Sequence, residues 1–201
     1  YDEALHRFED VDRGDAAVYD LIDYDITDAV IIMDDKLKCH PLSQRIIDRA
    51  RQKNIPSVII EGYYDNCINI NFDHATGMKA VIEHVIGEHG VTDVHFMNGA
   101  KDNPFAQSRL DIFKKLLVKY HIPYSDDMVS YGDFWVDPTV AAMEKLLQRE
   151  KLPRAIICAN DVMAITVCIM LQKAGYRIPE DVMVTGYDGI DEVYLSNPKI
   201  T

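Results

Sequence analysis

Short apolar runs alternate with longer segments of helical periodicity along most of this chain. The segment from Leu152 to Asp191 shows the alternation most clearly. Arg154 to Ala159 is an apolar run of the kind expected for a parallel strand covered on both faces. The next segment has apolar residues at helical spacing: Ala164, Val167, Cys168 and Leu171. Gly175 stands where a C-terminal glycine cap is expected, and a second apolar run covers Val182 to Thr185. The pattern predicts strand, helix, strand.

Polar residues follow both of these strands directly. Asn160-Asp161 comes after the first strand, and Asp161 is expected to be the N-cap of the helix. Gly186-Tyr187-Asp188 comes after the second strand. In an open α/β sheet, ligands bind at the carboxyl ends of the strands. We therefore expect Asn160 and Asp188 to lie at a ligand-binding edge.

The same alternation predicts the other elements. Strands are expected at Asp28–Met33, Ser57–Glu61, Cys67–Phe72, Thr92–Asn98 and Met128–Tyr131. Helices are expected at Leu42–Gln52, Asp73–Gly90 and Asn103–Tyr120, from Asp137 to about Glu150, and in part of the acidic segment Tyr1–Tyr24. The connections have ordinary lengths, which favours right-handed crossovers and parallel sheets, so the fold class is α/β. A doubly wound unit has about five strands, so the first unit is expected to lack its opening strand and helix.

Composition narrows the function. The 201 residues are 48% hydrophobic, which is typical of a folded globular protein. A net charge of -12 provides no electrostatic footprint for nucleic acid, so any DNA contact must come from a segment outside this chain. The apolar runs are too short to span a membrane. The four cysteines have no CxxC pair, which predicts free thiols in the cytoplasm and no zinc site. Because the chain starts at Tyr1 and not Met, we treat it as a fragment.

Arg109 can be singled out from its position alone. It falls on the same helix face as Leu116 and Tyr120, within an apolar stripe. A guanidinium on a buried face is costly unless an acceptor meets it. The residue either forms a structural ion pair, for example with Asp188, or contacts a ligand, and we favour the ligand.

Two adjacent aromatic residues, Phe134 and Trp135, follow the strand at Met128–Tyr131. We expect one ring to pack and the other to face the ligand, because a flat ring suits a sugar or a base. Asp188 suits a polyol, since a carboxylate can accept two bonds from a diol. Its competing role is an Asx-turn.

Signatures of enzymes and metal sites are missing. The sequence has no P-loop, no GxGxxG after a strand, no GxSxG and no HExxH, so we predict no catalytic function and no cofactor. Cys158 is a conceivable nucleophile, but no histidine lies close to it in the sequence. The seven histidines form no ligand-like set. His84 and His89 are five apart on a predicted helix, outside metal-binding spacing, and are expected to be solvated.

Three stretches carry a family resemblance: INFDHATG (70–77), ICANDVMA (157–164) and GYRIPEDVMVTGYDGID (175–191). They resemble the effector-binding domain of LacI/GalR-type bacterial regulators, whose fold is shared with type I periplasmic sugar-binding proteins. The resemblance covers roughly Asp28 to Thr201. It implies two doubly wound parallel-sheet lobes around a ligand cleft. Residues 1–75 would be a partial N-terminal lobe, 76–190 the C-terminal lobe, and 191–201 a crossover back toward the first lobe. The N-terminal DNA-binding headpiece would lie outside this chain.

The resemblance also implies roles for single residues. In the family, the residues matching Arg109 and Asp188 bind effector, and the position of Phe134 carries the stacking aromatic. Asn103 and Phe105 lie where relatives place polar or basic ligand contacts. Asn103 competes as the N-cap of a helix, whereas Phe105 departs from the usual small polar residue and disfavours a phosphate or strongly charged effector.

The remaining candidates complete the expected ligand site. Asp73, at the first crossover between lobes, is expected to touch the ligand or to serve the hinge. The predicted ligand-binding set is Asp73, Asn103, Phe105, Arg109, Phe134, Trp135, Asn160 and Asp188.

These observations predict a small-molecule sensor. The expected effector is a sugar, nucleoside or purine, and the expected assembly is a homodimer that switches by hinge closure. Three alternatives stay open: the same sensor attached to an output such as a diguanylate cyclase, a periplasmic sugar-binding protein of a transporter, and a hydrolase. The stretch RIPEDVMVTGYD favours the regulator, and the missing motifs disfavour the hydrolase.

Overall fold

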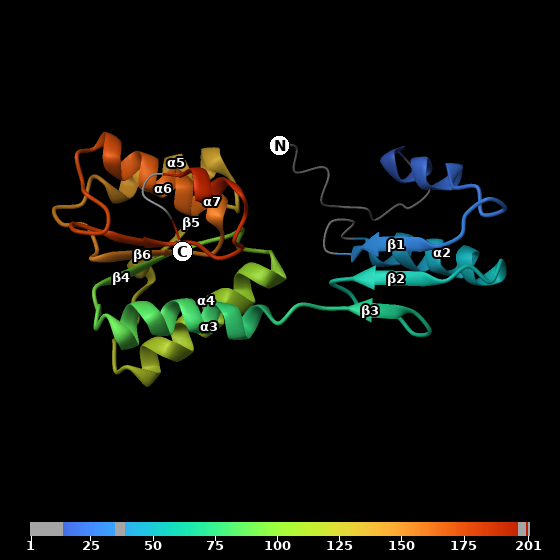
Figure 1. Ribbon diagram of the computed structural model, residues 1–201, viewed down its shortest axis with the longest axis horizontal. Coiled ribbons are helices and arrows are strands. Elements are labelled where there is room, and N and C mark those ends of the chain that lie inside the picture. Colours follow the sequence, from blue (N-terminus) through green and yellow to red (C-terminus); the bar gives the residue numbers. More distant parts are fainter. Residues whose placement is uncertain (1–13, 35–38, 197–199, 201) are drawn as a thin grey trace. The chain divides into compact units, whose positions relative to one another are not determined.

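The computed structural model describes residues 14–34, 39–196 and 200, and the chain divides into two compact units, Tyr1–Phe72 and Asp73–Thr201 (Figure 1). Each unit has its own parallel sheet and its own hydrophobic core. The predicted α/β class with parallel sheets is confirmed. No helix within the described ranges is long and apolar enough to cross a membrane.

The first unit contains a three-stranded sheet in the order β1-β2-β3, with all neighbours parallel. Its elements are the 3₁₀ helix η2 (Gly14–Leu21), β1 (Val30–Met33), α2 (His40–Gln52), β2 (Ser57–Ile60) and β3 (Ile68–Ile70). The buried side chains of α2, among them Leu42 and Ile47, pack with Ile32 and Ile59 of the sheet. The expected helix in Tyr1–Tyr24 is seen only in η2, and residues 1–13 lie outside the described ones.

The second unit contains a four-stranded parallel sheet in the order β5-β4-β6-β7. Its helices are α3 (His74–Glu83), the π-helical turn η3 (His84–Glu88), α4 (Pro104–Lys119), the 3₁₀ turn η4 (Asp126–Met128), α5 (Val136–Leu146), α6 (Asp161–Lys173) and α7 (Glu192–Leu195). Its strands are β4 (Val94–Asn98), β5 (Val129–Tyr131), β6 (Ala155–Cys158) and β7 (Met183–Thr185).

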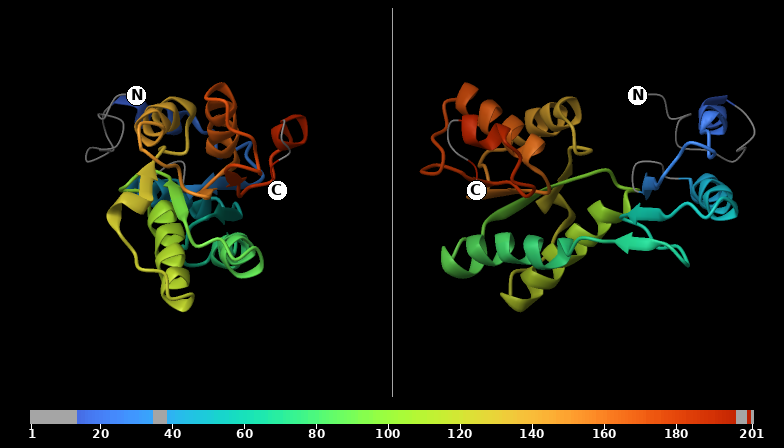
Figure 2. Two further views of the ribbon diagram at one scale, coloured as in Figure 1. Left: turned by 90° about the vertical axis from the view of Figure 1, so that its left-hand side faces the viewer. Right: turned by 45° about the vertical axis from the view of Figure 1, so that its right-hand side comes forward.

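Helices cover both faces of this second sheet. Helices α3 and α4 pack together on one face, and α5 and α6 pack together on the other (Figures 1 and 2). Every residue of the central strands β4 and β6 is therefore buried, which explains why β6 reads as a continuous apolar run. From β4 the chain continues to β5, which pairs with one edge of β4, and then crosses to β6, which pairs with the other edge of β4. The strand order therefore reverses between β4 and β6, where an open α/β sheet binds ligands.

Two predicted helix caps are wrong. Asn160, not Asp161, is the N-cap of α6, because its side-chain oxygen accepts from the backbone N–H of Met163 at 2.9 Å. Trp135 is the N-cap of α5, two residues before the expected cap Asp137, and the helix runs from Val136 to Leu146. The proposed role of 191–201 as a crossover stays a prediction, and residues 197–199 and 201 lie outside the described ones.

Candidate functional site

Four of the predicted site residues meet at the carboxyl edge of the second sheet. Arg109, 6% exposed, reaches from α4 and donates through Nη1 to the carbonyl oxygen of Ala159, just beyond β6. Its Nη2 lies 3.9 Å from Oδ1 of Asp188, which follows β7. The buried guanidinium therefore has both a carbonyl and a carboxylate acceptor, as its place in the apolar stripe requires.

Two aromatic rings flank the Arg109 guanidinium. Its central carbon lies 4.4 Å from the ring centroid of Tyr187 and 5.4 Å from that of Phe134. Both distances fit cation–π contacts, which help to hold a cation away from water. Phe134 thus lies beside Arg109, whereas Trp135 is 59% exposed.

Phe134 is held in an unusual backbone conformation. Asp133 and Phe134 have φ angles of 51° and 62°, in the left-handed region that disfavours large side chains. The ring lies over Gly99, where an added Cβ would come within 2.1 Å of it. The side-chain nitrogen of Asn160 donates to the carbonyl of Phe134 at 3.2 Å. Gly99, which leaves room for the ring, and Asn160, which binds the backbone of Phe134, therefore fix the Phe134 ring at the edge of the sheet.

Asp161 has a different role from the expected helix cap. It is 2% exposed, and its carboxylate accepts the backbone N–H groups of Tyr187 at 2.7 Å, Gly189 at 2.6 Å and Ile190 at 2.9 Å. These bonds span the loop after β7 that carries Asp188. Asp161 therefore positions Asp188.

Asn103, Phe105 and Asp73 lie at the starts of helices. Asn103 is the N-cap of α4, accepting from the backbone N–H of Phe105 at 2.9 Å, so the competing cap role is observed. Phe105 packs edge-on against His74, with ring centroids 5.4 Å apart. Asp73 is the N-cap of α3, and hydrogen bonds from the N–H and hydroxyl of Thr76 lower the pKa of its carboxyl group. The cap bonds of Asn103 and Asp73 do not test whether either also touches a ligand.

Tyr187 is a site residue that the sequence analysis missed. Its hydroxyl donates to the carbonyl of His74 at 3.2 Å and lies 3.3 Å from Nδ1 of the same residue. Its ring packs against Gly77, where an added Cβ would come within 2.9 Å. Tyr187 therefore links the start of α3 to Arg109. Its place between Gly186 and the predicted Asp188 was the available signal.

Asn98 is the second missed residue. It ends β4 and is fully buried, yet neither polar atom of its side chain has a hydrogen-bond partner among the residues that the structure describes. The hydroxyl of Thr185, at the end of β7, is also buried without a hydrogen-bond partner among the described residues. Unpaired buried groups cost about 1–3 kcal/mol each, so a polar partner such as an ordered water is expected at both. An asparagine at the end of an apolar strand was the sequence signal.

The assembled groups suit binding more than covalent chemistry. A cation, a carboxylate, amides and aromatic faces can together hold hydroxyl groups or ring nitrogens. Cys158, the conceivable nucleophile, is buried, and burial raises the pKa of its thiol well above the usual value. It therefore lacks the thiolate character that reactivity requires.

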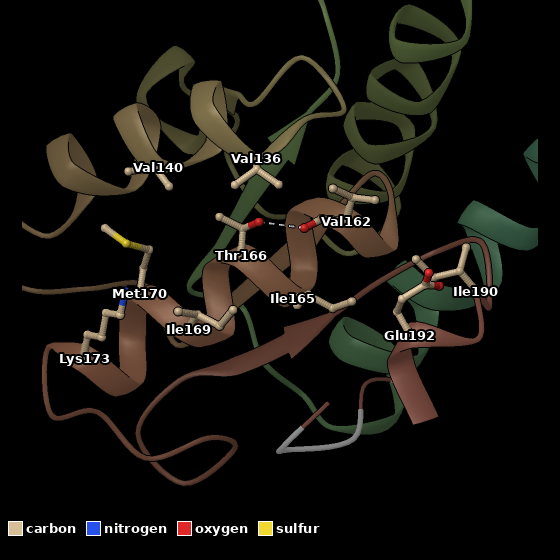
Figure 3. A pocket seen from close by; sticks show the side chains of 10 residues that line it. All are labelled: Val136, Val140, Val162, Ile165, Thr166, Ile169, Met170, Lys173, Ile190 and Glu192. Carbon is tan, nitrogen blue, oxygen red and sulfur yellow. Dashed lines mark hydrogen bonds between the residues drawn. The ribbon is translucent and has the colours of Figure 1, made fainter. Parts of the chain in front are cut away.

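Two grooves in the described part of the chain lie elsewhere. One, of about 390 Å³, runs between α5 and α6 and is lined by Val140, Ile165, Ile169 and the seven further residues shown in Figure 3. Most of these residues are apolar, and the hydroxyl of Thr166 is bonded to the carbonyl of Val162 at 2.8 Å. The other, of about 310 Å³, lies in the first unit beside β1. Neither is lined by the predicted ligand residues.

Comparisons with known proteins agree with this fold. Residues 82–201 match the family described as periplasmic binding protein-like domain. The chain is 27% identical, over 87% of its length, to the transcriptional repressor PurR of Vibrio cholerae, of which it covers 51%. It is also 27% identical, over 96% of its length, to the probable repressor ExuR of Bacillus subtilis, of which it covers 59%. The chain thus spans about half the length of the curated relatives it matches.

Solved structures give the same result. The complex of the transcriptional regulator CelR with cellobiose has a TM-score of 0.69 and 27% identity, covering 87% of this chain and 53% of that one. The Escherichia coli repressor ascG has a TM-score of 0.74 at 24% identity, covering 92% of this chain and 66% of that one, and supports the fold alone. The chain belongs to the periplasmic binding protein-like domain family, among the effector-binding domains of LacI/GalR-type regulators.

Proposed function

We propose that this domain senses a small polar molecule on behalf of a bacterial transcriptional regulator. The observation that carries the proposal is the meeting of Arg109, Phe134 and Asp188 at the carboxyl edge of the second sheet. The regulators PurR and ExuR among the relatives favour this output over a diguanylate cyclase, a transporter or a hydrolase. Because this chain is acidic, we assign DNA contact to a segment outside it. We also assign the protein to the cytoplasm, where a transcriptional regulator acts.

The proposed effector is a sugar, nucleoside or purine. Asp188 would accept bonds from hydroxyl groups or ring N–H groups, and Phe134 would stack on the flat face of the ligand. Phe105 places an apolar ring where a phosphate would need donors, so the effector is expected to be uncharged. Among the similar proteins, CelR was solved in complex with the sugar cellobiose, which supports a sugar as effector.

Switching is proposed to occur by closure of the two units on the ligand. A shift from almost all open to almost all closed requires the closed state to be favoured by roughly 5.5 kcal/mol. Only bonds that form after closure count toward this preference. Hydrogen bonds to charged groups contribute about 1.5–3 kcal/mol each, so two to four bonds made only in the closed state would supply the difference.

The test begins with a thermal-shift screen of sugars, nucleosides and purines, followed by calorimetry on the compounds that stabilise the chain. Asp188→Ala should lower the affinity at least a hundredfold with an unchanged circular dichroism spectrum. Asp93→Ala is the matched control, because Asp93 pairs with Lys151 at 3.0 Å just before β4, away from the carboxyl edge. Unchanged affinity in Asp188→Ala removes Asp188 from the site, and a panel without a single ligand rejects the effector class.

A further inference from the structure

A π-helical turn brings together the side chains of His84 and His89, which are five residues apart in the sequence. The turn η3 follows α3, and the backbone N–H of His89 donates to the carbonyl of His84 at 3.1 Å, five residues earlier. This bonding stacks residues five apart, as an α-helix does for residues three and four apart. As a result, Nε2 of His84 lies 3.1 Å from Nε2 of His89, although five-residue spacing does not bring side chains together on an α-helix. Both histidines are exposed, as expected.

The tautomers of the pair follow from a neighbouring carboxylate. Nδ1 of His84 lies 2.8 Å from Oε2 of Glu88. An ionised carboxylate can only accept, so Nδ1 of His84 is the donor. Neutral His84 then presents the lone pair of Nε2 to His89. The same carboxylate–imidazole arrangement orients histidines that bind metals in proteins.

The turn is anchored by packing, not only by its own hydrogen bonds. An added Cβ on Gly87 would come within 2.5 Å of the hydroxyl oxygen of Tyr120, at the end of α4. Beside it, Nζ of Lys119 lies 2.6 Å from Oε1 of Glu83. The His84 side chain is nevertheless half exposed, so an ion has access from solvent.

The distance between the two nitrogens suits a shared metal ion. Two nitrogens about 2.0–2.1 Å from one ion are about 2.9 Å apart at a right angle and about 3.4 Å apart at the tetrahedral angle. The observed 3.1 Å lies between these values. No group of three or more His, Cys, Asp or Glu side chains among the described residues could hold a metal, so water would complete the coordination.

We propose that His84 and His89 form a surface site for a divalent transition-metal ion of the borderline class, Cu²⁺, Ni²⁺ or Zn²⁺, with Glu88 as the positioning residue of His84. Imidazole nitrogen suits these three ions, and Cu²⁺ is bound most tightly of the three. Binding shifts the proton of His89 from Nε2 to Nδ1. The site lies at the opposite end of α3 from Asp73 and the candidate effector site, so it is independent of the proposed function.

The experiment titrates tag-free protein with NiCl₂ and with CuCl₂ near neutral pH. Calorimetry should give one equivalent, and bound Cu²⁺ should show the absorption of a nitrogen-ligated ion. His84→Ala and His89→Ala should each lower the affinity at least tenfold, and Glu88→Gln should lower it about tenfold. The affinity of the wild-type chain should fall in acid, because protons compete with the metal ion for the imidazole nitrogens.

His121→Asn is the matched control. His121 is exposed and has a φ of 57°, which asparagine tolerates, so this variant should keep the wild-type affinity. Circular dichroism of each variant, together with a rise in melting temperature on adding Ni²⁺ to the wild type but not to His89→Ala, separates lost binding from lost folding. Wild-type protein without a stoichiometric site, or equal affinities in the wild type and both histidine variants, overturns the proposal.

Discussion

Asn160 uses both ends of its side-chain amide. The oxygen caps α6 by accepting from Met163, and the nitrogen donates to the carbonyl of Phe134. A large residue in the left-handed region carries a strain of about 1–3 kcal/mol, so Phe134 needs an external partner to stay there. Asn160 therefore acts at the site by positioning Phe134, whether or not it also touches the effector.

Serine and alanine at position 160 separate these two roles. Asn160→Ser keeps a side-chain oxygen that can cap the helix but is too short to reach Phe134. Asn160→Ala loses both bonds and should be less stable than the serine variant by about 1 kcal/mol in urea denaturation. Both variants should bind effector several-fold more weakly. Equal stabilities of the two variants, or full affinity in Asn160→Ser, would contradict the division of roles.

The sequence could predict Arg109 but not the roles of Asn160 and Asp161. Helix geometry alone puts Arg109 on the apolar face, and a buried cation needs acceptors wherever the fold supplies them. Asn and Asp are equally good N-caps, so local preference could not decide between them. The decision comes from backbone N–H groups of residues 187, 189 and 190, which the fold brings to Asp161.

At the scale of elements, the loop after β7 is shaped by what α6 presents to it. An added Cβ on Gly186 would come within 2.0 Å of Oδ1 of Asp161, so the loop passes closer to that carboxylate than any other residue would permit. The three N–H bonds to Asp161 then fix the loop on both sides of Asp188. Asp161, at the start of α6, thus positions Asp188, which follows β7.

The strand β4 carries a buried histidine whose ionisation should be measurable. His95 is 1% exposed, its Nε2 lies 2.9 Å from the hydroxyl of Ser130, and burial, with a smaller contribution from the positive charge of Arg149, lowers its pKa to about 4. Asp127 opposes this shift without reversing it. The unfolded chain binds the proton near pH 6.5 and the folded chain only near pH 4, so stability should fall as pH drops through this window.

The expected loss is about 3 kcal/mol between pH 6.5 and pH 4, from a pKa difference of roughly two and a half units. Urea denaturation across this range should show it for the wild type. His95→Gln cannot titrate, and because both proteins share all other ionisable groups, the difference between their two stability curves isolates His95. Parallel curves would show that the acid sensitivity has another source.

Element types were predictable here, whereas the π turn was not. The apolar run predicted β6, because helices cover this strand on both faces of the sheet. The turn η3 continues a helix without any break in its local pattern. The hydrogen bonds of this turn join residues five apart, and Gly87 within it packs against Tyr120, 33 residues later in the sequence. Sequence periodicity is local and cannot reveal that contact.

At the scale of the whole molecule, the apolar groove between α5 and α6 bears on assembly. Val136 and Ile169 are 43% and 45% exposed there, and most of the residues that line the groove are apolar (Figure 3). Lys173 and Glu192 also line it. A surface that carries both charges around an apolar centre can pair with itself about a two-fold axis, as most protein dimers do. We therefore predict that the proposed homodimer covers this groove.

Sedimentation velocity across a range of protein concentrations tests this assembly. The wild-type chain should shift from monomer to dimer as its concentration rises, and Ile169→Asp should weaken the dimer more than a hundredfold, because an unpaired buried carboxylate costs about 3–5 kcal/mol. Val118→Asp is the matched control, since Val118 is 74% exposed on α4, which covers the other face of the sheet. A wild-type chain that stays monomeric rejects the dimer, and a dimer weakened by Val118→Asp but not by Ile169→Asp moves its interface to the α4 face.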